Sequence, residues 1–293
     1  MKRLSPYLFA LVIITALVLF FQDSIMTFIN YPATVTADSV ARPAAAGQIS
    51  DTPAASSPGH SSDVTPAQPI PAPEKYTGTA IPILMYHEVT SGPNSLYVPV
   101  GKFREQMRYL AVSGYRAVTM TQAEEMLRNK KMPAKTIVLT FDDGYTSFIT
   151  EAWPIMQEYG FTGTVYACTS FIGRPNYLTM EQIKTLQADG VEIGSHTRNH
   201  IDLKTASYKQ QVDEIVVSKQ ILEENLGVPC LSFCYPTGTY SDITPTIVKD
   251  AGYTSAVTVA YGHAVPASNP YLTPRVRVPG WITLDKFAQS IPK

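Results

Sequence analysis

The sequence predicts an α/β fold, specifically a distorted or incomplete (β/α) barrel of about seven parallel strands in a single domain. After residue 80, short apolar runs that are typical of strands alternate with helical patterns, as a series of βα units requires. Polar side chains directly follow several of these runs, and βα barrels carry their chemistry on the loops that follow the strands. Since only about seven runs are recognisable, we expect fewer strands than a complete eightfold barrel has.

The apolar runs that we expect to form strands can be followed along the chain in order. They are IPILMYH (81–87), TIVLTF (136–141), GTVYACT (163–169), VEIGSH (191–196), SFCYP (232–236), TSAVTVA (254–260) and TPRVRV (273–278). Between the first two, KFREQMRYL (102–110) has helical spacing. Two further helix starts are indicated by capping-box spacing, at Thr121 with Glu124 and at Thr179 with Gln182.

The first 76 residues have a different character. A basic start precedes an apolar run at 7–21, which is typical of an export signal, and apolar residues at 25–29 would extend it to a membrane span of about 20 residues. Residues 1–31 are therefore predicted to be a signal peptide or a membrane anchor, with the folded domain outside the cytoplasm. The Ala-, Pro-, Ser- and Thr-rich stretch at 32–76 is predicted to be a disordered linker, and 77–293 to be the folded domain.

The net charge and the number of cysteines argue against some classes of protein. The net charge of -1 gives no reason to expect a nucleic-acid partner. Three cysteines in an exported chain make an odd count, which argues against a disulfide framework. We expect Cys168, Cys230 and Cys234 to be buried free thiols. The sequence predicts no oligomeric state.

Two short motifs, TFDDGY (140–145) and SHTRNH (195–200), place carboxylates and imidazoles after predicted strands. Neutral imidazoles with one carboxylate are usual ligands of a catalytic zinc ion. His196 and His200 are four residues apart, so we expect one helical turn to bring both rings to the same side. Of Asp142 and Asp143, one would be a metal ligand and the other a base that takes a proton from water.

Each motif alone also has an ordinary structural interpretation. Two aspartates after a strand often form a turn or a helix N-cap, and a pair of histidines four apart is common by chance. Their joint appearance favours a hydrolase-like metal site. His87, Asp142, Asp143, His196 and Tyr235 all fall at or just past the end of a predicted strand, so we expect them at one end of the barrel.

These motifs resemble those of the polysaccharide deacetylases of the NodB-homology type, carbohydrate esterase family 4, over about residues 81–281. The resemblance implies that Asp142 is the base and that Asp143, His196 and His200 bind a divalent metal. Zn²⁺ is the first choice, although the ligand set also suits Co²⁺, Ni²⁺ or Fe²⁺.

A third family motif has its counterpart in FCYPTGTYS (233–241), with one departure. Pro236 and Gly238 agree with the family, but Cys234 stands where the family usually has the arginine that orients the catalytic aspartate. The resemblance further implies that the backbone N–H of Thr237 donates to the oxyanion.

The general acid of the family usually comes from a C-terminal strand, whereas here the matching pattern IPILMYHEV (81–89) lies at the front and delivers His87. This order, with the TPRVRV run, is similar to the circularly permuted subgroup that deacetylates poly-N-acetylglucosamine in biofilms. Arg275 or Arg277 would then replace the missing arginine; both share one strand face, so the choice stays open with a preference for Arg275. The alternative for His87 is a core histidine without a catalytic role. The alternative for the two arginines is a solvated strand face.

Sugars stack on aromatic faces, and Tyr145, Tyr240 and Trp281 lie near motifs or in loops. We expect these three to bind substrate, while packing is the alternative role for each.

As a whole, the resemblance implies a single catalytic domain that uses water and a metal to remove N-acetyl groups from an extracellular polysaccharide containing N-acetylglucosamine, releasing acetate. Poly-β-1,6-N-acetylglucosamine is the first expectation, with peptidoglycan or chitin as alternatives. An O-acetyl xylan esterase and an inactive carbohydrate-binding module are further alternatives. We expect an extracellular or membrane-anchored protein whose N-terminus associates with a membrane.

Overall fold

The structure, a computed structural model, describes residues 78–291. The predicted signal peptide or anchor (1–31) and the predicted linker (32–76) lie outside the described residues and stay predictions. Within 78–291, no helix has both the length and the apolar character needed to cross a membrane.

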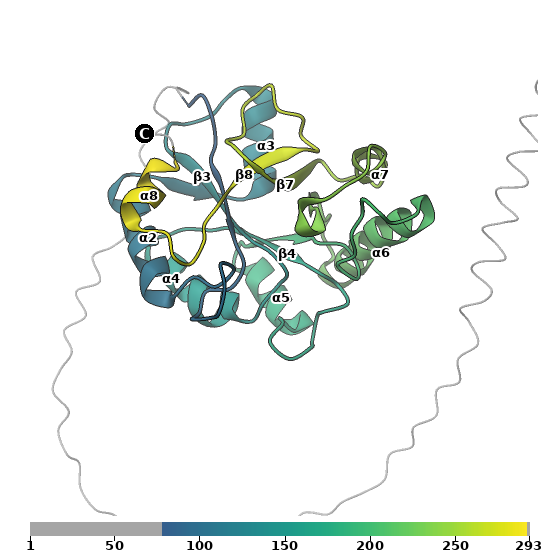
Figure 1. Cartoon of the computed structure of the whole chain (residues 1–293), viewed down its shortest axis with the longest axis horizontal. Helices are drawn as coiled ribbons and strands as arrows, with labels where there is room; N and C mark the ends of the chain where they lie inside the picture. Colours follow the sequence, from purple (N-terminus) through teal and green to yellow (C-terminus); the bar gives the residue numbers. More distant parts are fainter. Residues whose placement is uncertain (1–77, 292–293) are drawn as a thin grey trace, which may run out of the picture. The chain divides into compact units, whose positions relative to one another are not determined.

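Parallel strands form the centre of the fold (Figure 1). They are β1 (Ile83–Tyr86), β2 (Arg116–Val118), β3 (Thr136–Phe141), β4 (Thr164–Ala167), β5 (Glu192–Ser195), β6 (Ser232–Cys234), β7 (Ser255–Tyr261) and β8 (Thr273–Arg277). The order β1-β8-β7-β6-β5-β4-β3 closes into a ring because β1 pairs with both β8 and β3. The predicted barrel of about seven parallel strands is thus confirmed.

Strand β2 was not predicted from the sequence. It pairs with β3 outside the closed ring, and it has only three residues, of which Val118 alone is buried. So short a segment lacks the apolar run that identified the other strands.

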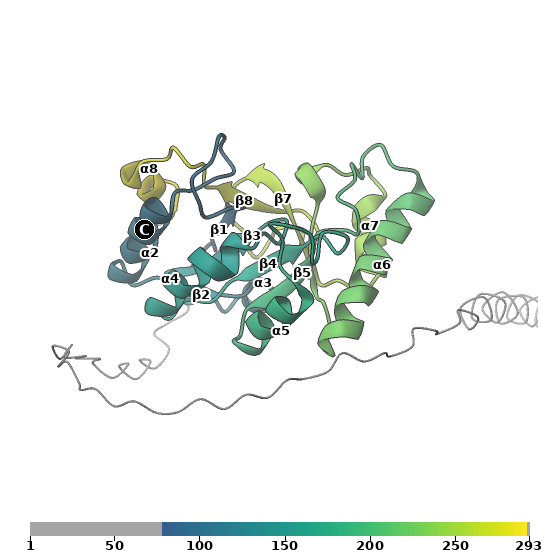
Figure 2. The ribbon, with the colours of Figure 1, turned by 90° about the horizontal axis from the view of Figure 1, so that it is seen from below.

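Helices surround the ring of strands (Figures 1 and 2). They are α2 (Val100–Val112), α3 (Met120–Asn129), α4 (Trp153–Glu158), α5 (Met180–Ala188), α6 (Tyr208–Leu226), α7 (Thr244–Asp250) and α8 (Leu284–Gln289). The first and last of these lie side by side, with the rings of Tyr109 and Phe287 6.1 Å apart. The C-terminal helix α8 therefore packs against the first helix, α2.

One of the two predicted helix starts is confirmed and the other is wrong. Thr179 and Gln182 form the capping box of α5. Helix α3 instead begins at Met120 with a capping box of Thr119 and Gln122, because this register buries Met120 on its inner face. The hydroxyl of Thr121, which had been expected to cap the helix, donates to Glu192 at 2.8 Å.

A cluster of aromatic rings positions the ends of β1 and β3. Tyr86 and Phe141, the last residues of these strands, stack with ring centroids 5.3 Å apart. Phe103 of α2 packs edge-on against both, and Phe148, in a π-helical turn before α4, lies 4.7 Å from Phe141. Because all four side chains are almost fully buried, they hold in place the residues that directly follow the two strands.

Candidate active site

The carboxyl ends of the barrel strands surround a pocket of about 300 Å³. Its lining residues are Met85, His87, Leu96, Asp142, Asp143, His196, His200, Tyr235, Thr237, Val259 and Arg277. Most of the residues that the sequence singled out for chemistry therefore lie together at one end of the barrel.

Asp143 lies between the two histidines of the second motif. Its Oδ1 atom is 3.2 Å from Nε2 of His196 and 3.3 Å from Nε2 of His200. Yet this buried oxygen has no hydrogen-bond partner among the described residues. A buried carboxylate oxygen without a partner is costly, and a cation between the three ligand atoms would remove that cost. The donor set fits a divalent metal ion.

The tautomer of His196 agrees with this interpretation. Its Nδ1–H donates to the backbone carbonyl of Cys234 at 2.8 Å, so Nε2 carries the lone pair that faces Asp143.

The expectation that one helical turn joins His196 and His200 is wrong. The segment is a loop in which Thr197 and His200 adopt φ angles of 65° and 57°. The backbone N–H of His200 donates to Oγ1 of Thr197 at 3.0 Å. The backbone N–H and side-chain amide of Asn199 donate to the carboxylate of Glu214, at 2.7 and 2.6 Å. A tight turn thus replaces the helix.

Glu214 is a supporting residue that the sequence analysis missed. It is buried on the inner face of α6, next to Ile215 and close to Gln211. A carboxylate on the inner face of an amphipathic helix must find a partner, and that is the signal that would have identified it.

Asp142 forms a buried ion pair with Arg275 of β8. Nη1 and Nη2 of the arginine donate to Oδ1 and Oδ2 of the aspartate, each at 2.7 Å. Two further bonds fix the guanidinium, to Oγ1 of Thr140 and to the carbonyl of Thr258, both at 2.9 Å. Burial acts to raise the pKa of Asp142, but the charge and hydrogen bonds of Arg275 hold it below its usual range.

The structure places the two arginines of TPRVRV at different depths. Nη2 of Arg275 lies 3.3 Å from Sγ of Cys234, the residue that stands at the usual arginine position of the family motif. Arg277 lies on the same strand two residues nearer the mouth, and its Nη2 donates to Oγ of Ser95 at 2.8 Å. Of the two arginines, only Arg275 therefore contacts Asp142.

His87 follows β1 and lies beside the ion pair. Its Nε2 atom is 3.9 Å from Oδ2 of Asp142. Burial lowers the pKa of His87, and the nearby carboxylates partly oppose this shift. The imidazole reaches the pocket from the side of β1, next to β3 and the two aspartates.

The backbone around the pocket is strained at several points. Asp143, Thr197, His200 and Thr237 adopt φ angles of 73°, 65°, 57° and 55°. Non-glycine residues take up this region at a cost, and such residues cluster at functional sites. The left-handed Thr237 places its backbone at the pocket wall.

None of the three aromatic residues expected to bind substrate lines this pocket. Tyr145 stacks on Tyr177 with centroids 4.9 Å apart, and Tyr240 packs 5.1 Å from the buried ring of Tyr235. Trp281 is 68% exposed in the loop after β8. A role in sugar binding outside the pocket stays a prediction for each.

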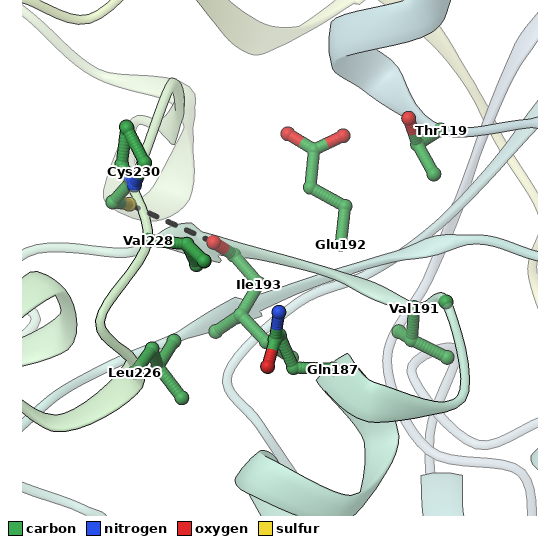
Figure 3. Close-up of a pocket in the computed structure, with 10 residues that line it drawn as sticks. Thr119, Gln187, Val191, Glu192, Ile193, Leu226, Val228 and Cys230 are labelled. Carbon is green, nitrogen blue, oxygen red and sulfur yellow. Dashed lines mark hydrogen bonds between the residues drawn. The ribbon is translucent and has the colours of Figure 1, made fainter.

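A second pocket, of about 210 Å³, includes Thr119, Glu192 and Cys230 in its lining (Figure 3). Glu192 is its one charged lining residue, and this carboxylate accepts hydrogen bonds from Thr121 and Ser232. Burial raises the pKa of the Cys230 thiol to about 12, so the thiol is unreactive. All three cysteines are buried and free, as expected, and this pocket has no group poised for chemistry.

Comparisons with known proteins agree with the geometry. The family model for polysaccharide deacetylases matches residues 129–256. The chain is 37% identical over 212 residues to YxkH of Bacillus subtilis (strain 168), whose name assigns it to the polysaccharide deacetylases; the match covers 72% of this chain and 76% of that protein. The chain belongs to the polysaccharide deacetylase family. The resemblance inferred from its motifs is confirmed.

Other relatives of this deacetylase extend the comparison. The structure of the Streptococcus pyogenes deacetylase PplD in complex with acetate matches with a TM-score of 0.70 and 30% identity, over 76% of this chain and 100% of that one. The poly-β-1,6-N-acetyl-D-glucosamine N-deacetylase of Escherichia coli (strain K12) is 27% identical over 238 residues, which cover 66% of this chain and 35% of that enzyme. This deacetylase is therefore a hydrolase.

Proposed function

We propose that this deacetylase is a metal-dependent hydrolase that removes N-acetyl groups from an extracellular polysaccharide containing N-acetylglucosamine. The observation that carries the proposal is the buried, unpartnered Oδ1 of Asp143 between His196 and His200, in the same pocket as Asp142. This arrangement supports a metal site with a separate base beside it.

Asp143, His196 and His200 would hold the divalent metal, with Zn²⁺ as the first choice and Co²⁺, Ni²⁺ or Fe²⁺ as alternatives. When bound, the metal polarises the acetyl carbonyl and acidifies a water molecule. The hydrogen bond from His196 to the carbonyl of Cys234 orients one ligand ring, and Glu214 holds the loop that carries the other.

The remaining residues act on protons and charge. Asp142 takes the proton of the attacking water, while Arg275 keeps this carboxylate ionised and oriented. The backbone N–H of Thr237 donates to the oxygen that becomes negatively charged. His87 gives a proton to the departing nitrogen, so that acetate and a glucosamine unit are the products.

The preferred substrate in this proposal is poly-β-1,6-N-acetylglucosamine. Support comes from the name of the E. coli relative, and from the position of His87 directly after the first barrel strand and of Arg275 on the last, as the permuted subgroup implies. The substrate polymer lies outside the cytoplasm, and residues 1–31 export or anchor the domain.

Acetate release by the purified full chain tests this function. The substrates are β-1,6-linked N-acetylglucosamine oligomers, β-1,4-linked chitin oligomers, peptidoglycan and acetylated xylan, each with and without chelator. We expect chelator-sensitive release that is fastest from the β-1,6 oligomers. Preference for another polymer would change the proposed substrate but not the proposed mechanism. If no polymer released acetate, a carbohydrate-binding module would be favoured.

A further inference from the structure

The wall of the pocket opposite the metal ligands has no role in the chemistry described above. In the ring order, β3 and β5 carry the proposed ligands, β1 carries His87, and β6 leads to Thr237. The wall itself is formed by Val259 of β7 and by Arg277, which ends β8 two residues beyond Arg275. A substrate bound against the catalytic groups would contact this wall on its opposite side.

Arg277 gives this wall a positive charge. Among the residues that line the pocket it is the one lysine or arginine, and its hydrogen-bond partner Ser95 is neutral. The charge of Asp142 is already balanced by Arg275, and Asp143 lies between two imidazoles. No ion pair of Arg277 occurs within residues 78–291, so its guanidinium charge is left for a ligand.

The loop that holds this guanidinium is itself fixed. The backbone N–H of Gly280 donates to the carbonyl of Ser95 at 3.4 Å, and Nζ of Lys102 donates to the carbonyl of Gly280 at 3.0 Å. A Cβ atom at position 280 would lie 1.8 Å from the carbonyl oxygen of Tyr97, so only glycine permits this close approach. The residue that Arg277 contacts, Ser95, is thus held in place before a ligand arrives.

We propose that Arg277 makes the enzyme select glycan segments in which the units next to the reacting one still carry their N-acetyl groups. The inference rests on the proposed function. The guanidinium donates to hydroxyl and acetamide oxygens, which a neutral N-acetylated unit supplies. A deacetylated unit instead carries an ammonium group, which has only donors and repels the guanidinium.

The consequence is a spaced pattern of deacetylation. In the solvent-filled mouth, repulsion between this guanidinium and an ammonium group should weaken binding about threefold to tenfold. Each reaction would therefore slow the next reaction on adjacent units. Because the charges are exposed to solvent, salt should reduce the effect.

The test compares two substrates that differ in one charge. One is a fully N-acetylated β-1,6 oligomer, and the other is the same oligomer with a free amino group on a unit next to the cleaved amide. The measured quantity is the ratio of the two kcat/KM values for the wild type, Arg277→Gln and Arg277→Lys. Arg116→Gln is the matched control, since Arg116 is an exposed arginine at the start of β2 and lines a different pocket.

We expect the wild type and Arg116→Gln to prefer the fully acetylated oligomer about threefold to tenfold, and Arg277→Gln to lose most of that preference. Arg277→Lys should retain it, and high salt should diminish it in the wild type, Arg116→Gln and Arg277→Lys. An unchanged ratio in Arg277→Gln would overturn the inference, as would a wild-type ratio near one.

Failure of the proposed substrate would look different. In that case the wild type would leave both β-1,6 oligomers intact and would release acetate from another N-acetylated glycan, from which the same substrate pair is then prepared. If the wild type releases acetate from no N-acetylated glycan, both the proposed function and this inference are wrong.

Discussion

Arg275 and Asp142 form a bidentate ion pair inside the barrel, although 133 residues separate them in the chain. Neither side chain is more than 4% exposed. The contact is possible because β1 lies between β8 and β3 and pairs with both. Removing one partner of such a pair leaves an uncompensated buried charge, which costs about 3 to 5 kcal/mol.

Replacing the proposed base, Asp142, should separate turnover from metal binding. In Asp142→Asn, the amide cannot take the proton of water, so acetate release should fall to background while Asp143, His196 and His200 still bind metal. The unpaired Arg275 should also destabilise the fold by about 3 to 5 kcal/mol. Turnover, bound metal and thermal unfolding are measured on one preparation. Loss of metal equal to the loss of turnover would show that Asp142 is a ligand.

Removing the arginine should change the pH profile. Arg275 lowers the pKa of Asp142 against the effect of burial, so in Arg275→Gln burial dominates and that pKa rises. The carboxyl group then stays protonated to a higher pH. The acidic limb of kcat/KM should move upward. Because the folded-state pKa then exceeds the unfolded one, the variant should lose stability as the pH rises through that pKa, whereas the wild type loses it as the pH falls. A profile identical to that of the wild type would contradict the role of Arg275.

Much of this site was predictable because its groups lie in contiguous motifs after apolar runs. The features that the sequence could not predict depend on contacts with other elements or on left-handed backbone conformations. Spacing alone does not show that Thr197 and His200 are left-handed, so the helical turn was a reasonable but wrong expectation. Arg275 and Arg277 share a strand face, and only their depth along β8 distinguishes them.

The proposed role of His87, protonation of the leaving group, should matter more for some substrates than for others. An amine must be protonated as it departs, whereas an alkoxide leaves more readily. His87→Gln should therefore lower kcat about 10²- to 10⁴-fold on an N-acetyl substrate and much less on an O-acetyl ester. The two rates are compared in the same buffer. Wild-type turnover of the amide would show that His87 is an ordinary buried histidine.

The support of the histidine loop should appear in metal affinity. Glu214 accepts two hydrogen bonds from Asn199, next to His200, so Glu214→Gln should weaken metal binding about 10- to 100-fold. Glu223→Gln is the control, because Glu223 lies on the same helix but accepts a hydrogen bond from the backbone N–H of Cys230 instead. The measurement is competition with a calibrated chelator. Equal weakening in both variants would indicate a general effect on α6.

The central claim, that Asp143, His196 and His200 hold a catalytic metal, is tested most directly by metal titration. The chelated full chain is titrated with Zn²⁺ while acetate release is followed, with Asp143→Ala in parallel. The account predicts no release without metal, full recovery at one ion per chain, and no recovery in the variant. Full turnover by the metal-free wild type would contradict it.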